Sequence, residues 1–294
     1  MKKTFANLTL VAATAAVVSV FWLNLDDSVA QSGSASLDEI PRTPDGRPDM
    51  NGIWQTMNNA HWNLEAAPAA HGPLVEAGAH LAVRPTLGVV QGGAIPYKEG
   101  MREIQRENRA NWLERDPVTK CFKPGVPRAT YKPYPFQIFL APDTTLFAYQ
   151  YSGSNRLVYM DQPDLEPSVD SWMGHNLGHW DGDTLVIDVY GQMAESWFDR
   201  AGHHHSGWDK HVQERYTMVD RNTIHYEATI TDPNVFEEPW TIEMPIYRRQ
   251  EANMKLLEFK CVEFVEELLY GHLRAPGDPF GDGLPIIPPP PARD

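Results

Sequence analysis

The second half of the chain alternates apolar and polar residues with a period of two, which restricts it largely to β-strands. The pattern predicts strands over 136–140, 145–151, 156–160, 185–189, 211–219, 223–231, 240–247 and 256–261. Asp181-Gly182-Asp183 lies between two apolar runs, and Asp-Gly in that setting is a strong hairpin signal because type I′ turns need positive φ. Many short strands at regular spacing predict a mainly β fold, an antiparallel β-barrel or β-sandwich.

Outside this region the sequence predicts one surface helix over 98–113, ended by Asp116-Pro117. The expected domain organisation is a segment 1–30, a linker 31–50, a single β-rich domain 51–274 and a Pro-rich tail 275–294 without regular structure. Gly52-Ile53-Trp54 is similar to the Gly-x-Trp near the first strand of lipocalin-type barrels, which makes a calycin-like barrel one form of the expected fold.

The first 30 residues have the order of regions found in a secretory signal. Lys2 and Lys3 precede an apolar run over 8–23, and Ser28-Val29-Ala30 offers small residues where a signal peptidase cuts. The run is shorter than the roughly 20 residues that span a bilayer comfortably. The segment is therefore either a cleaved signal peptide or an uncleaved anchor, and both place the body in the periplasm or outside the cell.

An exported location changes the interpretation of the two cysteines, Cys121 and Cys261. In an oxidising compartment a lone pair usually forms a disulfide, and the alternative is two buried thiols. The formal net charge is −14, so the surface repels phosphate backbones and we expect no nucleic-acid partner. Contact with a membrane is expected only through the N-terminal segment.

Several stretches resemble a widespread family of exported, largely uncharacterised bacterial proteins. The matching motifs are Pro124-Gly125-Val126-Pro127-Arg128, the run 178–186 (GHWDGDTLV), the run 197–202 (WFDRAG), His205-Ser206 and Glu214-Arg215. The resemblance extends over 45–271 and implies an exported, β-rich protein, but no activity. His203 and His204 depart from the family's pattern, which puts in doubt any metal site that needs all three neighbouring histidines.

Three residues could carry proton transfer. Glu214 shares a strand face with Val212, Tyr216 and Met218, and a carboxylate on an apolar face needs a partner or its pKa rises. The alternative is a buried ion pair with Arg156, Arg200 or Arg128. In the Gly-containing loop that precedes this strand, Asp199 could orient His205, which could move a proton near neutral pH.

The remaining candidate residues would bind a ligand. Arg200, Arg156 and Arg128 could hold an anionic group, and Trp180 and Trp197 could line an aromatic pocket. The histidines at 203–205 suggest metal binding, but no metal-ligand spacing of a known kind is present, and we assign no metal ligand. The sequence identifies no cofactor.

These observations support three hypotheses. The first is an acid–base enzyme, a lyase, isomerase or hydrolase acting on a small apolar or aromatic compound, with Glu214, His205 and Asp199 as its catalytic residues. The second is a ligand-binding protein that uses the same pocket without turnover. The third is an accessory subunit of an envelope complex, which would contact a protein partner through the tail 275–294 and the irregular N-terminal part.

Overall fold

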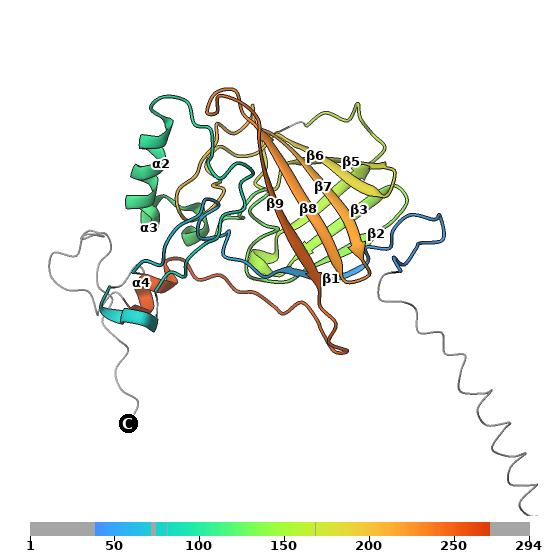
Figure 1. Ribbon diagram of the computed structural model, residues 1–294, viewed down its shortest axis with the longest axis horizontal. Helices are drawn as coiled ribbons and strands as arrows, with labels where there is room; N and C mark the ends of the chain where they lie inside the picture. Colours follow the sequence, from blue (N-terminus) through green and yellow to red (C-terminus); the bar gives the residue numbers. More distant parts are fainter. Residues whose placement is uncertain (1–38, 72–74, 81, 168, 271–294) are drawn as a thin grey trace, which may run out of the picture. The chain divides into compact units, whose positions relative to one another are not determined.

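A computed structural model of the chain describes residues 39–71, 75–80, 82–167 and 169–270. The described residues from Ile40 onward form one unit. It is mainly β, as the sequence predicts, and its centre is a closed barrel of nine strands (Figure 1). The strands are β1 (Gly52–Thr56), β2 (Phe136–Leu140), β3 (Thr144–Tyr149), β4 (Asn155–Met160), β5 (His175–Asp181), β6 (Thr184–Tyr190), β7 (His211–Asp220), β8 (Thr223–Thr231) and β9 (Trp240–Arg248).

Neighbouring strands in the chain are neighbours in the barrel, and β1 closes it by pairing with β9. Eight of these pairings are antiparallel, and β4 with β5 is parallel. The expectation of a fully antiparallel sheet is therefore wrong at this one place. A parallel pair needs a crossover, and residues 161–174 provide it.

Alternate side chains fill the barrel, because the side-chain period of a strand is two. On β7 the inward residues are Val212, Glu214, Tyr216 and Met218, all at most 4% exposed, which confirms the predicted face. β5 contributes Gly178, whose absent Cβ would lie 2.6 Å from Met160 Sδ and 2.6 Å from Val158 Cγ1. The glycine of the Gly-His-Trp motif thus leaves room for two apolar side chains of β4.

The turn predicted at Asp181-Gly182-Asp183 does join β5 to β6. Among its residues only Gly182 has positive φ, at 58°. This is the pattern of a type II′ turn, with glycine at the first central position, and the type I′ geometry is wrong. The hairpin was still predictable because both turn types favour glycine.

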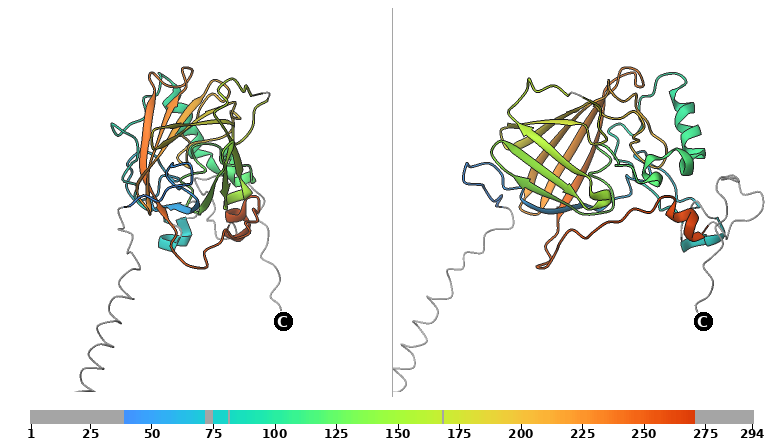
Figure 2. Two further views of the ribbon diagram at one scale, coloured as in Figure 1. Left: turned by 90° about the vertical axis from the view of Figure 1, so that its right-hand side faces the viewer. Right: turned by 180° about the vertical axis from the view of Figure 1, so that it is seen from behind.

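The predicted helix 98–113 is present as two shorter ones, α2 (Met101–Ala110) and α3 (Trp112–Arg115). Its buried residues are Gln105, Asn108, Trp112 and Leu113, whereas Ile104 is exposed. Figures 1 and 2 show both helices beside the barrel, with loop segments between them and the strands. The buried amides are explained by these loops: Gln105 donates to the carbonyl of Ala201, and Asn108 to that of Gly202.

Cys121 and Cys261 form a disulfide with a Cα–Cα distance of 5.6 Å, which confirms the expected pair. Cys121 follows a short 3₁₀ helix, η2 (Pro117–Lys120), and Cys261 precedes α4 (Val265–Tyr270). The strand predicted over 256–261 is wrong, since these residues have no strand structure. The edge of β9 that they would need is already occupied by β1.

No described helix has the length and apolar character that crossing a membrane requires. The N-terminal segment 1–30, residues 31–38 of the linker and the tail 275–294 lie outside the described residues.

Candidate functional site

Glu214 lies inside the barrel with all of its partners from the barrel wall. Its Oε1 accepts hydrogen bonds from the hydroxyls of Tyr226, at 2.7 Å, and Tyr216, at 3.0 Å. Its Oε2 accepts a hydrogen bond from Arg156 Nη1. The pair Glu214–Arg156 is fully buried, so the partner is Arg156, and not Arg200 or Arg128.

Arg156 is held as firmly as its partner. Its guanidinium lies over the Phe147 ring at 4.6 Å and donates to Asn176 Oδ1 at 3.3 Å. Burial disfavours its charge, but the Glu214 carboxylate and the tyrosine oxygens raise its pKa well above the ordinary value. Burial and the same carboxylate raise the pKa of Tyr216. The network is therefore a charged pair braced by two neutral tyrosines, as a buried ion pair requires.

Asp199 does not orient His205. Its Oδ2 instead lies 2.6 Å from His203 Nδ1 and accepts a hydrogen bond from the Leu64 amide at 2.7 Å. On the other side of the ring, His203 Nε2 lies 3.5 Å from Glu65 Oε2. Burial disfavours the imidazolium, but the Asp199 and Glu65 carboxylates raise the pKa of His203 to about 9. His203 is thus a buried cation at neutral pH, held between two carboxylates.

His205 lies in a different environment from His203. Its Nδ1 accepts a hydrogen bond from the Gly207 amide at 3.0 Å, so its Nε2 carries the proton toward Ser196 Oγ at 2.8 Å. Burial and the positive charge of Lys210 hold its pKa well below the usual range. A neutral imidazole with both nitrogens engaged, 4% exposed, is a structural element of the loop.

Sequence reasoning missed Glu65, Arg102 and Lys210. Arg102 binds the Glu65 carboxylate through both terminal nitrogens, at 2.9 and 2.8 Å, and this completes the chain of charges that begins at Asp199. Lys210 is buried, donates to the carbonyl of Val126 at 3.1 Å, and has its pKa lowered by burial. No local pattern marks these residues, because their partners come from distant loops.

Arg128 of the Pro-Gly-Val-Pro-Arg motif is a structural residue. Its two terminal nitrogens donate to Asp116 at 2.8 and 2.7 Å, and both side chains are buried. Asp116 also accepts a hydrogen bond from the Val118 amide at the start of η2. The pair therefore fixes the segment that carries Cys121.

Arg200, unlike Arg128, lines cavities that are formed largely by loop residues. Its amide donates to the carbonyl of His61 at 3.0 Å, and its guanidinium lies over Trp62 at 4.8 Å and over Trp112 at 4.4 Å. Arg200 and Trp62 belong to the lining of two cavities. Stacking on two indoles holds the guanidinium plane in place.

The first of these cavities, here called cavity A, has a volume of about 460 Å³. It lies between α2, α3 and the loop residues 62–71, 83–86 and 200–201. Its walls are mainly apolar, with Trp62 and Trp112 as the largest side chains. Four arginines also line it, namely Arg84, Arg106, Arg109 and Arg200, and none of the described residues that line it is Asp or Glu.

The other predicted ligand-contacting residues lie elsewhere. Trp197 is 6% exposed and packs with Trp112 and Leu113 in a small apolar cluster. Trp180 is half-buried on β5, with Arg47 over its ring at 5.5 Å. Arg156 belongs to the lining of a polar cavity of about 510 Å³ near His175 and Asn176, although its side chain is fully buried. None of these residues lines cavity A.

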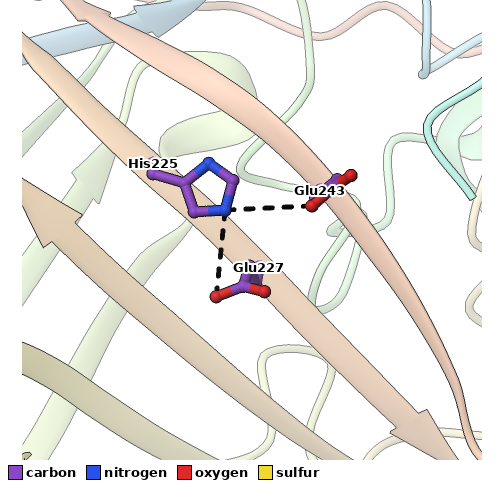
Figure 3. Close-up of side chains that lie close together, drawn as sticks. All are labelled: His225, Glu227 and Glu243. Carbon is purple, nitrogen blue, oxygen red and sulfur yellow. Dashed lines mark ion pairs between the residues drawn. The ribbon is translucent and has the colours of Figure 1, made fainter. Parts of the chain in front are cut away.

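Metal-binding geometry occurs in one place among the described residues, and it is not at 203–205. His225 and Glu227 of β8 and Glu243 of β9 bring three ligand atoms within 4.8 Å of one another on the outer wall of the barrel (Figure 3). His225 Nε2 lies 3.8 Å from Glu227 and 3.9 Å from Glu243. The cluster is partly exposed and lies in no cavity named here, and cross-strand placement of polar residues on an outer face explains it.

Comparisons with protein-family models, with curated proteins and with solved structures found no match for this chain. The functional assignment therefore rests on the geometry of the site.

Proposed function

We propose that this protein binds a small organic anion with an aromatic or apolar body, and that cavity A is the binding site. The supporting observation is the contrast between the cavity and the whole chain. The chain has 39 acidic and 25 basic residues, yet the described lining of cavity A contains four arginines and no carboxylate.

The cavity has the composition of a small-molecule site. Such sites are mainly apolar, with a few polar groups that set orientation, and have volumes of roughly 300–1,000 Å³. Trp62 and Trp112 offer flat faces for a ring, and arginine recognises carboxylate, sulfate or phosphate oxygens in a planar, two-pronged geometry. Arg84 and Arg109 lie at the exposed rim, and within the described part of the chain neither has an ion pair or hydrogen-bonded partner.

Binding without turnover fits the geometry better than acid–base catalysis by the predicted residues. Glu214 has both carboxylate oxygens engaged by Arg156, Tyr216 and Tyr226, and it lines none of the cavities named here. His205 has both ring nitrogens engaged. A general acid or base must reach its substrate, and neither Glu214 nor His205 lines one of these cavities.

The proposed place of action is the periplasm or the outside of the cell. The Cys121–Cys261 disulfide is compatible with an oxidising compartment, and the order of regions in residues 1–30 is that of a secretory signal. An accessory-subunit role involving the tail 275–294 remains a prediction, since that segment lies outside the described residues.

The test compares two probes of the same shape by isothermal titration calorimetry. One is biphenyl monocarboxylate and the other is the neutral biphenyl carboxamide. The rim arginines Arg84 and Arg109 should favour the anion by about tenfold in Kd at low salt, with the preference falling as salt rises. The double variant Arg84→Ala/Arg109→Ala should reduce it to about threefold or less.

A matched control removes a positive charge elsewhere. Lys255→Ala changes an exposed lysine that lines neither cavity of Arg200, and it should leave the preference unchanged. Equal affinity for the anion and the amide in the wild-type protein would contradict the proposal.

A further inference from the structure

The segment after β9 lies against Gln150 and Thr119, which are far away in the sequence. Residues 249–264, here called the strap, contain no helix or strand and run from the end of β9 to α4 (Figure 1). Leu257 N donates to Gln150 Oε1 at 2.9 Å, and Phe264 N donates to the carbonyl of Thr119 at 2.8 Å. The disulfide through Cys261 fixes the strap between these two points.

The strap forms one wall of a second cavity, here called cavity B, of about 330 Å³. Phe259 packs on Tyr151, with ring centroids 4.7 Å apart, and meets Tyr134 edge-on at 5.3 Å. Phe259, Lys260 and Cys261 all line cavity B, and so do both tyrosines. The packing of Phe259 and the disulfide at Cys261 therefore hold the strap in place, and Lys260, which lies between them, lines cavity B.

The opposite wall of cavity B carries positive charge. Lys132 and Arg200 line it, and none of the described lining residues is Asp or Glu. His61, which also lines cavity B, has a buried Nδ1 with no hydrogen-bond partner among the described residues. Burial, and to a lesser extent the charges of Lys132, Arg128 and Arg200, lower the pKa of His61 to about 3.

The two cavities adjoin each other. Trp62 and Arg200 appear in the walls of both, and the Arg200 guanidinium is held over the Trp62 ring. A ligand seated in cavity A would therefore have its inner end beside Arg200, next to a cavity that again offers cations and aromatic faces. Both cavities therefore offer cationic and aromatic side chains, although the chain as a whole is acidic.

We infer that cavity B is a second anion subsite of the same binding region, so that the ligand is an elongated dianion with an aromatic centre. This inference rests on the proposed function of cavity A. One anionic group lies among the rim arginines of cavity A, and the other reaches Lys260 and Lys132 in cavity B. Arg200 and Trp62 lie between the two subsites and contact the aromatic centre.

The experiment compares biphenyl monocarboxylate with the para,para′ biphenyl dicarboxylate by titration calorimetry. In the wild-type protein the dianion should bind about tenfold more tightly, as expected for a second charge-assisted contact. Lys260→Ala should reduce this ratio to about threefold or less and leave the affinity for the monoanion within about twofold. Lys260 is exposed and, within the described part of the chain, its one ion pair is a long one, 3.6 Å to Glu258, so its loss should not disturb folding.

Two further variants separate the subsites. Lys255→Ala, on the same strap but outside cavity B, should leave the ratio unchanged. Cys121→Ser/Cys261→Ser releases the strap, and it should lower the ratio as Lys260→Ala does while the monoanion still binds.

The possible failures are distinguishable. If the monoanion binds in an Arg109-dependent way but the dianion binds no more tightly, cavity B is not a subsite and the proposed function stands. If the dianion binds more tightly but Lys260→Ala leaves the ratio unchanged, the second contact lies elsewhere and the inference is overturned. If neither probe binds, the proposed function fails and the inference fails with it.

Discussion

Replacing Glu214 by glutamine tests whether the charged network in the barrel is structural. The change keeps the size of the side chain and one carbonyl oxygen, but it removes the negative charge opposite Arg156. Arg156 is fully buried, and its closest charged partner is that carboxylate. Glu214→Gln therefore leaves a buried cation whose hydrogen-bonding neighbours, the new amide, Asn176 and Tyr216, are all neutral.

The expected cost follows from this burial. Removing one partner of a buried pair typically destabilises by about 3–5 kcal/mol, because the other charge is left uncompensated. For a domain of this size, each kcal/mol shifts Tm by about 2–4 °C. Glu214→Gln should therefore lower Tm by roughly 6–20 °C. A double variant with Arg156→Met should recover part of this loss, because neither charge then remains.

The assay is guanidinium unfolding followed by tryptophan fluorescence, with calorimetry for Tm. Glu227→Gln is the matched control, since Glu227 lies on the outer face of the adjoining strand β8 with a partly exposed side chain. A substitution at such a position usually changes stability by less than about 0.5 kcal/mol. A change below about 1 kcal/mol for Glu214→Gln, equal to that of the control, would refute the structural role.

Two further predictions concern residues outside the barrel strands, namely His203 and the Cys121–Cys261 disulfide. The pKa of His203 is raised to about 9 in the folded protein, against roughly 6.5 in the unfolded chain. The protonated ring therefore contributes its full stabilisation of the fold below pH 6.5, and this stabilisation is lost as the pH rises through 9. Unfolding free energies between pH 6 and 10 should fall by about 3 kcal/mol more in the wild type than in His203→Gln, and parallel curves would contradict this. Reduction of Cys121–Cys261, which closes a span of 140 residues, should cost up to about 5 kcal/mol in the chain-entropy model; equal denaturation midpoints with and without reductant would argue against it.

The barrel was predictable because its signal is local. Burial on alternate residues of β7 and β8 follows from the pleat of a strand, and the glycine at 182 marks the turn between β5 and β6 from its neighbours alone. The parallel pairing of β4 with β5 was not predictable, because it depends on where the crossover 161–174 returns. The strand predicted over 256–261 rested on an alternation of apolar residues that includes Phe259. In the structure Phe259 packs on Tyr134 and Tyr151, and its segment pairs with no strand.

The site was less predictable because its residues come from segments far apart in the chain. Glu214 could be placed on the inner face, but three arginines were equally good partners until the barrel brought Arg156 opposite. Asp199 was paired with the wrong histidine, since sequence proximity does not tell which ring a loop turns inward. Cavity A combines residues from 62–71, 83–86, 106–112 and 200–201, and no single stretch of these carries a recognisable motif.

Native mass spectrometry of the protein purified from its own envelope tests the central claim most directly. The account predicts a one-to-one complex with a small organic acid, lost in Arg84→Glu/Arg109→Glu and retained in Lys255→Glu. A bound neutral or cationic molecule, or an adduct that survives the double charge reversal, would contradict the claim that cavity A binds an anion.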